Sequence, residues 1–440
     1  DPMQIRSIEL RNFKGLSKLK FQLSPGFNIL SSSNEEDKTS ILQSFALGLH
    51  VLSDHFLLVS ASFDKERDTA STAKIEKKEK TDDLLEFNFG GSCTIEMNDE
   101  NHQLSISRVV DDSEKEETII VDSSADSSAL ERKSENEFPI FAFYRSSRFL
   151  HCDWIETVRS SRFSNDTRCS VYESWQDAGN AESCSSTLSW IREKTSVRLD
   201  YAERGLDATP PVENDGGTAL SRIVNDAFPE IVDVCWDRDV SSVLVSKEIK
   251  GKLGDFRIMQ IPFEMLSDGE RSVIMLFADI LRRMCVLHPH LKASEAMRTD
   301  GIVLIDDLEA HLHPDWQRRI LKGLRRAFPR VQFIAATNSP IMIGEVEPNG
   351  VHLLDGGKIV QPVQSYGLDV NEVLEQILHT ERQSIEVKEA VGKIKELIEI
   401  GKTDEARNRL NALEEKLNGS IRSTRDADAA ISFKESILKE

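Results

Sequence analysis

The segment from residue 301 to residue 340 constrains the fold more than any other part of the chain. Two short runs in it, GIVLI and VQFIAA, are almost wholly apolar, and each leads through a polar turn into a helix-like segment. Continuous apolar strands are typical of a parallel sheet that is covered on both faces, because a sheet with one solvated face would alternate apolar and polar residues. We therefore expect an α/β protein built on parallel core strands.

Four regions are expected along the 440 residues. They are an N-terminal lobe with an antiparallel β-subdomain, a mainly helical insertion, a C-terminal lobe and a C-terminal helical hairpin, at residues 3–150, 151–230, 231–365 and 366–440. The lobe opens with strands at 5–13 and 18–30, and short strand-like runs between residues 84 and 121, the first two separated by Gly90-Gly91, predict the subdomain. Apolar residues at helical spacing on both sides of Gly401 predict the hairpin.

The stretch FNILSSSNEEDKTSIL has the outline of a phosphate-binding loop that lacks its glycines. A loop of the form G-x-x-x-x-G-K-[ST] binds phosphates through backbone N–H groups and a lysine, and its hydroxyl ligates Mg²⁺. Lys38 and Thr39 are in place before a helix expected from about Ser40, but Ser32 and Asp37 occupy the glycine positions. A carboxylate about 5 Å from a phosphate charge costs roughly 3 kcal/mol at an effective dielectric of 20, so this loop is weakened.

Three further motifs place polar side chains where strands end or helices begin. IVLIDDLEAHLHP ends an apolar run at Asp306 and Asp307, where the first carboxylate can hold Mg²⁺ and the second can orient an attacking water. MLSDGERSVIML opens a helix and can offer N–H groups and a hydroxyl to a phosphate, although Ser267 or Asp268 could equally be an ordinary N-cap. FIAATNSP places Asn338 near the same sheet edge as Asp306.

Together with LRNFKGL and FAFYRSSR, these motifs closely resemble those of the RecF/SMC-like ABC ATPases, over about residues 3–365. The resemblance implies an ABC-type ATPase head that pairs with a second copy and encloses ATP between the loop of one copy and the Ser-Asp-Gly-Glu turn of the other. The residues that would then bind the nucleotide are Ser32, Asn34, Asp37, Lys38, Thr39, Ser267, Gly269 and Glu270. Thr39 and Asp306 would hold Mg²⁺.

Three departures from the pattern of that family bear on turnover. The catalytic glutamate position holds Asp307, which is one methylene shorter and by geometry alone can cost on the order of 100-fold in rate. The switch histidine position holds Asn338, which cannot carry a proton, and the loop glycines are replaced by Ser32 and Asp37. We therefore expect weak hydrolysis or none.

A finer resemblance rests on the short head and on the segment SYGLDVNEVLEQIL, which are similar to the ATPase subunits of Septu-type and retron-linked anti-phage systems. That resemblance implies a homo-oligomeric scaffold that holds an HNH nuclease, with nucleic acid contacted through the nuclease. A net charge of −20 agrees, because it opposes binding of DNA over a broad face. Two alternatives stay open: an active DNA-repair ATPase of the RecF kind, and a pseudo-ATPase that no longer binds nucleotide.

The remaining features predict a cytoplasmic protein without a membrane segment. We find no apolar run of bilayer length and no charged-then-apolar leader in the sequence. Six cysteines are scattered without short paired spacings, which favours thiols over a zinc site or disulfides. His311 and His313 flank a leucine near Asp306, and we interpret them as part of a structural turn rather than as metal ligands.

Overall fold

The protein is described by a computed structural model. It describes residues 2–13, 16–32, 35–67, 87–98, 103–110, 117–123, 138–149, 152, 154, 166–203, 215–251, 255–380 and 384–437. These residues divide into two compact units, Asp1–Leu368, which we call the head, and Asp369–Glu440, which we call the C-terminal unit.

A six-stranded sheet forms the centre of the described head, in the order β14-β13-β3-β12-β11-β7. Its strands are β3 Phe27–Ser32, β7 Ile140–Tyr144, β11 Gly301–Ile305, β12 Val331–Ala336, β13 Val351–Asp355 and β14 Lys358–Val360. All of them run parallel except β14, and every residue of β3, β7, β11 and β12 is buried. The predicted α/β class with parallel core strands is therefore confirmed.

A second sheet is antiparallel, with the order β2-β1-β4-β5-β6 among the described residues. Its strands are β1 Gln4–Phe13, β2 Leu16–Gln22, β4 Phe87–Asn98, β5 Gln103–Val110 and β6 Glu117–Ser123. The single strand expected at 18–30 is wrong, because the chain leaves this sheet after Gln22 and enters the central sheet at Phe27. The expected Gly90-Gly91 turn is also wrong: both glycines lie inside β4, where a register shift against β1 marks a bulge.

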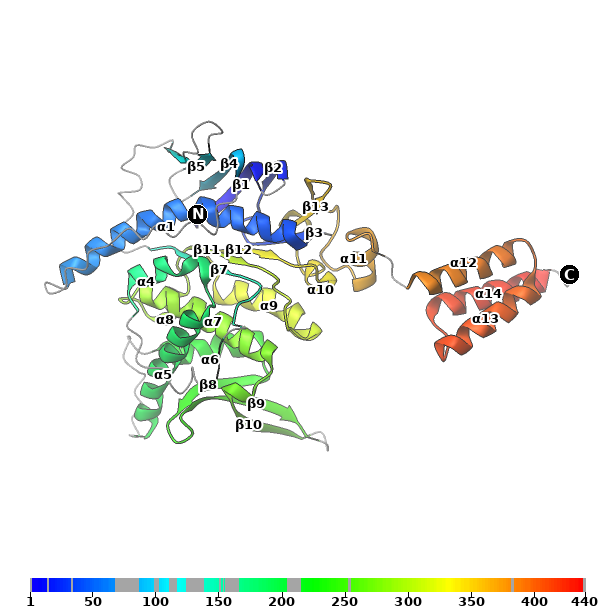
Figure 1. Cartoon of the computed structure of the whole chain (residues 1–440). Coiled ribbons are helices and arrows are strands. Elements are labelled where there is room, and N and C mark those ends of the chain that lie inside the picture. The colour runs from blue at the N-terminus through cyan, green and yellow to red at the C-terminus, as the bar shows by residue number, and fades with distance from the viewer. Residues whose placement is uncertain are drawn as a thin grey trace. The chain divides into compact units, whose positions relative to one another are not determined.

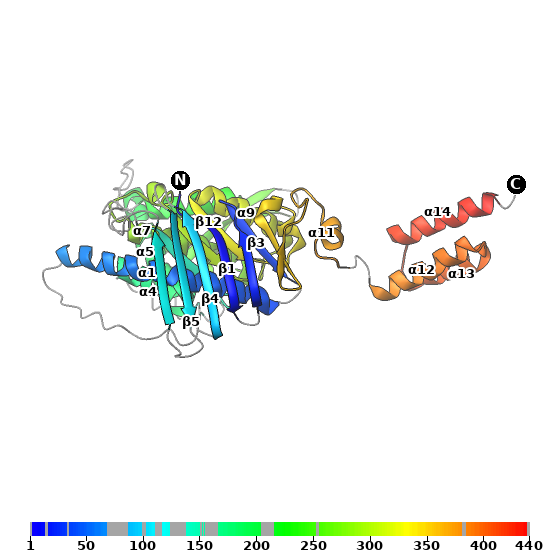
Figure 2. The ribbon, with the colours of Figure 1, turned by 90° about the horizontal axis from the view of Figure 1, so that it is seen from above.

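The long helix α1, Glu35–Arg67, lies between these two sheets (Figures 1 and 2). Residues of its predicted apolar stripe are buried, including Ile41, Phe45 and Leu49. Among the described residues, one helical segment, Lys38–Leu58, has the length and apolar composition to cross a membrane, and 61% of its most apolar window is buried inside the protein. The expectation that no such run exists is therefore wrong, and packing between two sheets accounts for the apolar composition.

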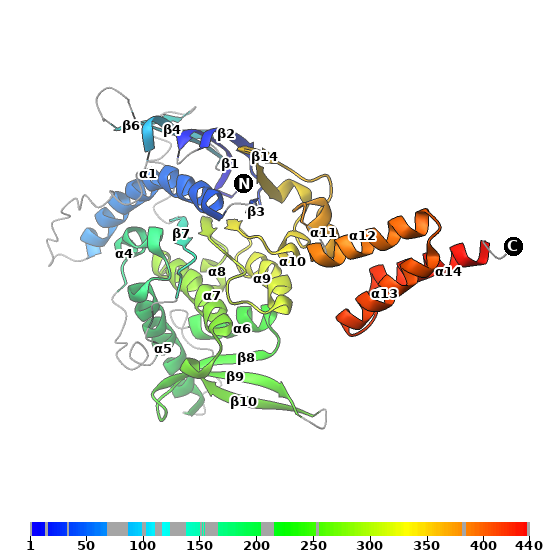
Figure 3. The same cartoon turned by 45° about the vertical axis from the view of Figure 1, so that its right-hand side comes forward.

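Helices lie on the other side of the central sheet, with α5 and α6 farther from the sheet than α7 (Figure 1). They are α4 Arg168–Glu173, α5 Ala181–Glu203, α6 Gly216–Ala227, α7 Asp268–Leu287, α8 Ala293–Ala296, α9 Pro314–Ala327 and α10 Pro340–Ile343. A small antiparallel sheet, β10-β9-β8, packs through β8 against α5 and α6 and lies below α6 in Figure 3. Its strands are β8 Ile231–Asp237, β9 Ser242–Lys250 and β10 Phe256–Pro262.

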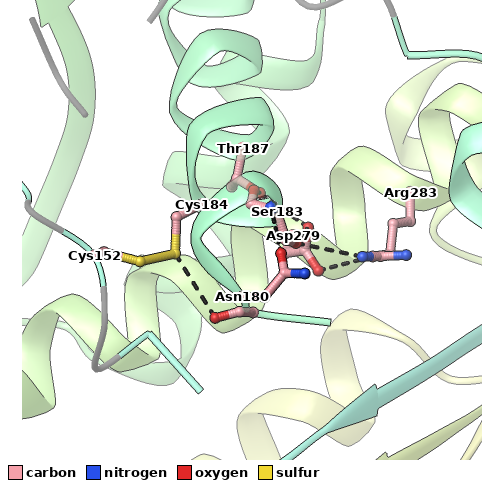
Figure 4. Close-up of a disulfide and its surroundings, with 8 residues drawn as sticks. Cys152, Asn180, Ser183, Cys184, Thr187, Asp279 and Arg283 are labelled. Atoms are coloured by element: carbon pink, nitrogen blue, oxygen red, sulfur yellow. Dashed lines mark hydrogen bonds and ion pairs between the residues drawn. A yellow bond between two sulfur atoms is a disulfide. The ribbon is translucent and has the colours of Figure 1, made fainter. Parts of the chain in front are cut away.

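A disulfide joins Cys152 to Cys184, near the start of α5 (Figure 4). The expectation that the cysteines are thiols is wrong for this pair. Their spacing gives no sign of the disulfide, because the two cysteines are 32 residues apart in the sequence. Their Cα atoms lie 6.8 Å apart because the chain after β7 returns to the first turn of α5. The other four cysteines, which are all described, remain thiols.

The C-terminal unit contains the helices α11 Val370–Gln376, α12 Ile385–Glu399, α13 Thr403–Leu417 and α14 Arg422–Ile437. The predicted hairpin is present as α12 and α13, which turn at Gly401 with a positive φ of 79°. A third helix, α14, was not expected. Its buried residues Ala427 and Ile431 join the apolar faces of α12 and α13 in one small core, so α12, α13 and α14 pack together as three helices.

Candidate functional site

The predicted phosphate loop lies at the junction of β3 and α1. β3 ends at Ser32 and α1 begins at Glu35, five residues before the expected start near Ser40. Asn34 and the side chain of Asp37 lie outside the described residues. The early helix start places Lys38 within the first turns of α1, where the positive end of the helix favours an anion.

The junction brings together three of the predicted phosphate and metal ligands. Lys38 is buried, with 2% of its surface exposed. The next residue, Thr39, donates a hydrogen bond of 2.8 Å from Oγ1 to Oδ2 of Asp306, at the end of β11. Burial raises the pKa of Asp306, and the Thr39 hydrogen bond and the Lys38 charge oppose that rise only in part. A hydroxyl, a carboxylate and an ammonium group thus meet at the carboxyl edge of the sheet, and they are the groups that a nucleotide with Mg²⁺ requires.

Asn338, the residue at the switch position, lies beside this group. Its Oδ1 accepts hydrogen bonds from Ser31 Oγ at 3.1 Å and from Ser32 N at 3.4 Å. Its backbone N donates to Oε1 of Glu309 at 2.9 Å. The other carboxylate oxygen of Glu309 is buried and has no hydrogen-bond partner within the described residues. An unsatisfied buried carboxylate oxygen beside Asn338 is compatible with a site that is completed by a ligand, a cation or water.

Asp307 occupies a turn that bends immediately after β11. Its φ of +43° lies in the left-handed region, which residues with a Cβ rarely adopt. Its backbone N donates to Asp306 Oδ1 at 3.2 Å, and its carbonyl oxygen accepts from Nη2 of Arg148 at 3.0 Å. Hydrogen bonds thus hold the backbone at Asp307 in an unusual conformation, and the role of Asp307 toward an attacking water stays a prediction.

The Ser-Asp-Gly-Glu turn forms a second group at the start of α7. Ser267 is the N-cap, and Ser267 and Glu270 form a reciprocal capping box, so the capping interpretation is confirmed for this chain. Glu270 also pairs with Lys247 of β9. A Cβ added at Gly269 would lie 2.3 Å from the carbonyl oxygen of His311, so only glycine fits against that turn. Ser267 and Glu270 thus bond to each other, and Glu270 pairs with β9. Within the described residues, no hydrogen bond joins them to Thr39 or Asp306.

The histidine turn is structural, as interpreted from the sequence. His313 caps α9 by accepting from Asp315 N at 3.3 Å, and His311 has a positive φ of 63°. Within the described part of the chain, no group of three or more histidine, cysteine or acidic side chains is arranged to hold a metal ion by itself. A Mg²⁺ ion at Thr39 and Asp306 would need phosphate oxygens and water as its other ligands, which is the usual arrangement for this ion in nucleotide sites.

Two residues of the site were missed in the sequence. Arg148 contacts the turn after β11, and Glu309 contacts Asn338. Arg148 ends the motif FAFYRSSR, which indicates the resemblance but by itself assigns no role to this arginine. Glu309 lies three residues beyond Asp306, and an acidic residue in a strand-to-helix turn has no distinctive pattern by itself.

Comparison with known proteins supports the predicted resemblance. The family described as "AAA domain, putative AbiEii toxin, Type IV TA system" matches residues 237–343. "Retron Vc95 probable ATPase" from Vibrio cholerae serotype O1 biovar El Tor is 24% identical over 442 residues, which cover 91% of this chain and 85% of that protein. "Septu protein PtuA" from Bacillus thuringiensis is 22% identical over 397 residues, which cover 85% and 84% of the two chains.

Solved structures give more distant likenesses. The "SMC head domain from Thermotoga maritima" has 12% sequence identity and a TM-score of 0.40, covering 81% of this chain and 98% of that one. The structure of the "recombination mediator protein RecF-ATPrS in RecFOR pathway" has 13% identity and a TM-score of 0.39, covering 82% and 98%. The fold assignment rests on the sheet order described above. Over most of its length the chain is thus similar in sequence to a retron ATPase and to a Septu protein, as its motifs predicted.

Proposed function

We propose that this chain is the nucleotide-binding subunit of a cytoplasmic anti-phage defence complex, that it binds ATP with Mg²⁺ and hydrolyses it slowly, and that it holds an HNH nuclease. The observation that carries the proposal is the hydrogen bond of 2.8 Å from Thr39 to Asp306 beside the buried Lys38. The similarity to a retron ATPase and a Septu protein supports the biological setting.

The described residues suggest how ATP would be held. The ammonium group of Lys38 and the N-terminus of α1 supply positive charge for the phosphates. Mg²⁺, when bound by Thr39 and Asp306, would neutralise phosphate charge that Asp306 otherwise repels. Burial raises the pKa of Asp306. A cation bound beside this carboxylate would favour its charged form and so lower the pKa again.

Slow turnover follows from the groups around the phosphates. Asp307 is shorter than the glutamate usual in such sites, and its carbonyl is held by Arg148, so its backbone is not free to move closer to a phosphate. Asn338 uses its amide oxygen to accept from Ser31 and Ser32 and has no proton to exchange at neutral pH. These groups can bind and orient a nucleotide more readily than they can activate water.

Calorimetry of ATP binding tests the proposal. We expect the wild-type chain with Mg²⁺ to bind ATP and to release phosphate slowly, and Lys38→Ala to lose binding by at least tenfold, because charged hydrogen bonds to phosphate contribute about 1.5–3 kcal/mol each. Lys322→Ala is the matched control, since Lys322 is an exposed lysine of α9 that pairs with Glu345. Equal binding by wild type and Lys38→Ala contradicts the site.

The same experiment separates the alternative functions. Fast, DNA-stimulated phosphate release that depends on Lys38 would favour a DNA-repair ATPase of the RecF kind. No ATP binding by the wild-type chain would favour a pseudo-ATPase whose head serves only assembly.

Nucleotide enclosed between two copies predicts that ATP shifts the chain toward dimers or larger oligomers, because Ser267 and Gly269 would contact the phosphates of the partner copy. Analytical ultracentrifugation with and without ATP measures this shift.

The C-terminal unit is proposed to hold the nuclease. Phe433 of α14 is an apolar residue with 69% of its surface exposed, next to a core that the three helices complete by themselves. We expect Phe433→Glu to weaken binding of the co-expressed nuclease by roughly 30-fold, the effect of losing an apolar anchor worth about 2 kcal/mol. Co-purification and a titration of the nuclease measure the effect.

The control for this experiment is Val363→Glu, which replaces a fully exposed apolar residue of the head by the same charge. We expect Val363→Glu to leave nuclease binding unchanged. If Phe433→Glu keeps the nuclease but alters the oligomer size, the C-terminal unit binds another copy of this chain rather than the nuclease.

A further inference from the structure

Arg148 holds the turn that carries the two adjacent carboxylates of the site. It lies four residues after the end of β7, and 6% of its surface is exposed. Its guanidinium donates to three consecutive carbonyl oxygens after β11: from Nη1 to Asp306 at 2.5 Å, and from Nη2 to Asp307 at 3.0 Å and Leu308 at 3.3 Å. All three acceptors are backbone atoms, so Arg148 fixes the course of the chain rather than one side chain.

The turn needs this support. The left-handed φ of Asp307 is unfavourable for a residue with a Cβ, and such conformations persist only where surrounding contacts impose them. Three hydrogen bonds from one planar guanidinium impose both the direction and the spacing of the carbonyls. Burial lowers the pKa of Arg148 to about 10 although nearby carboxylates oppose the change, so the group stays charged at neutral pH.

Arg148 is itself held by the turn that follows β7. Its backbone N donates to the carbonyl of Arg145 at 3.0 Å, which closes the turn after β7. The next residue, Phe149, donates to the carbonyl of Gly179 at 2.8 Å, two residues before the start of α5. The segment that carries Arg148 is thus fastened to the chain just before α5, which limits the movement of the guanidinium.

We propose that Arg148 is a positioning residue of the nucleotide site, which acts by fixing the Asp306–Leu308 backbone so that Asp306 can share a cation with Thr39 and Asp307 can face the reacting phosphate. This inference rests on the proposed function, because it assigns a role within the ATP site. It gives the motif FAFYRSSR, whose last residue is Arg148, a physical task in the head.

The proposal divides the affinity for ATP into a part that does not need Mg²⁺ and a part that Mg²⁺ adds. Lys38 and the N-terminus of α1 supply charge for the phosphates, whereas the guanidinium of Arg148 bonds to Arg145 and to the turn after β11 within the described residues. The Mg²⁺-dependent part depends on Asp306, and loss of a group that orients a metal ligand usually costs about 10–100-fold in metal affinity. A general loss of fold would reduce both parts alike.

Arg148→Lys is the informative variant, because lysine keeps the charge but offers a point charge in place of the planar fork. We expect it to bind ATP without Mg²⁺ as the wild type does, and to lose about 10–100-fold of the affinity gain that Mg²⁺ gives. Hydrogen exchange without nucleotide should be faster in the peptide that covers residues 306–310. Arg145→Lys is the control, since Arg145 lies on the same turn, pairs with Asp177 and is expected to change neither quantity.

The outcomes distinguish this inference from the function on which it rests. A wild-type chain whose ATP affinity does not respond to Mg²⁺ overturns the proposed function, and the positioning role with it. A Mg²⁺ response in the wild type that Arg148→Lys leaves unchanged overturns the positioning role alone. An equal loss of affinity with and without Mg²⁺ also overturns it, because that result shows only a structural role for Arg148.

Discussion

Replacing Asp279 by alanine is expected to lower the free energy of unfolding by about 3–5 kcal/mol, because it leaves the buried guanidinium of Arg283 without its carboxylate, while Arg282 keeps its pair with Asp166. Asp279 lies on α7 with none of its surface exposed. It accepts from Arg282 at 2.6 Å and from Arg283 at 2.8 Å, and both guanidinium groups are buried with it. Unfolding in urea, followed by circular dichroism, measures the change.

Neutral donors complete the surroundings of Asp279. Tyr144 of β7 donates to it at 2.7 Å, and Ser183 and Thr187 of α5 donate at 3.1 Å and 2.9 Å (Figure 4 shows the α5 side). One carboxylate thus joins the central sheet, α5 and α7. The control is Asp255→Ala, which breaks the exposed pair of Asp255 with Arg257 and should cost less than about 1 kcal/mol. A similar small loss for both variants would contradict the role of Asp279.

The effect of Asp279→Ala should also depend on pH. Burial alone would raise the pKa of Asp279, but the charges of Arg283 and Arg282 outweigh it and hold the pKa well below the ordinary value. A carboxylate whose folded-state pKa is lowered stabilises the protein above its unfolded-state pKa of about 3.9, and this contribution is lost as pH falls toward the folded-state pKa. The difference in the free energy of unfolding between wild type and variant should therefore be largest near pH 7 and smaller at pH 3.

The parallel core could be predicted because two of its strands are apolar along their whole length. The run GIVLI corresponds to β11 and VQFIAA to β12, since only a strand buried on both faces is apolar throughout. The ends of these strands then place Asp306 and Asn338 at one edge of the sheet. The contact of Thr39 with Asp306 follows from the same rule once β3 is known to be parallel to β12.

Other parts of the structure depend on contacts that no local pattern reveals. The sequence does not indicate the early start of α1, because Glu35 falls within the pattern of the phosphate loop. The pairing of Cys152 and the contacts of Arg148 are tertiary, since their partners lie 32 and about 160 residues away in the chain. The third helix of the C-terminal unit was missed because its sequence is mostly polar, and only a few residues such as Ile431 reach the core.

The second large effect expected is a gain of function. We expect Asp307→Glu to raise the rate of ATP hydrolysis by roughly 100-fold, because misplacing a catalytic group by about 1 Å can cost that factor. The carbonyl of Asp307 is held by Arg148, so a longer side chain is the direct way for a carboxylate to reach further without moving the backbone. Glutamate adopts the left-handed φ of this turn less readily than aspartate, so the unfolding free energy of the variant is measured beside its rate. Phosphate release under saturating ATP and Mg²⁺ measures the rate.

The matched control for Asp307→Glu is Asp306→Glu, which adds the same methylene at the neighbouring carboxylate. Asp306 already lies 2.8 Å from Thr39, so lengthening it should disturb the cation site and lower ATP affinity instead of raising the rate. If Asp307→Glu hydrolyses no faster than the wild type, the short carboxylate does not limit turnover, and Asn338 becomes the next group to change. Adding Asn338→His to Asp307→Glu then decides whether a protonatable group at the switch position is what the site lacks, although it also removes the acceptor of Ser31 and Ser32.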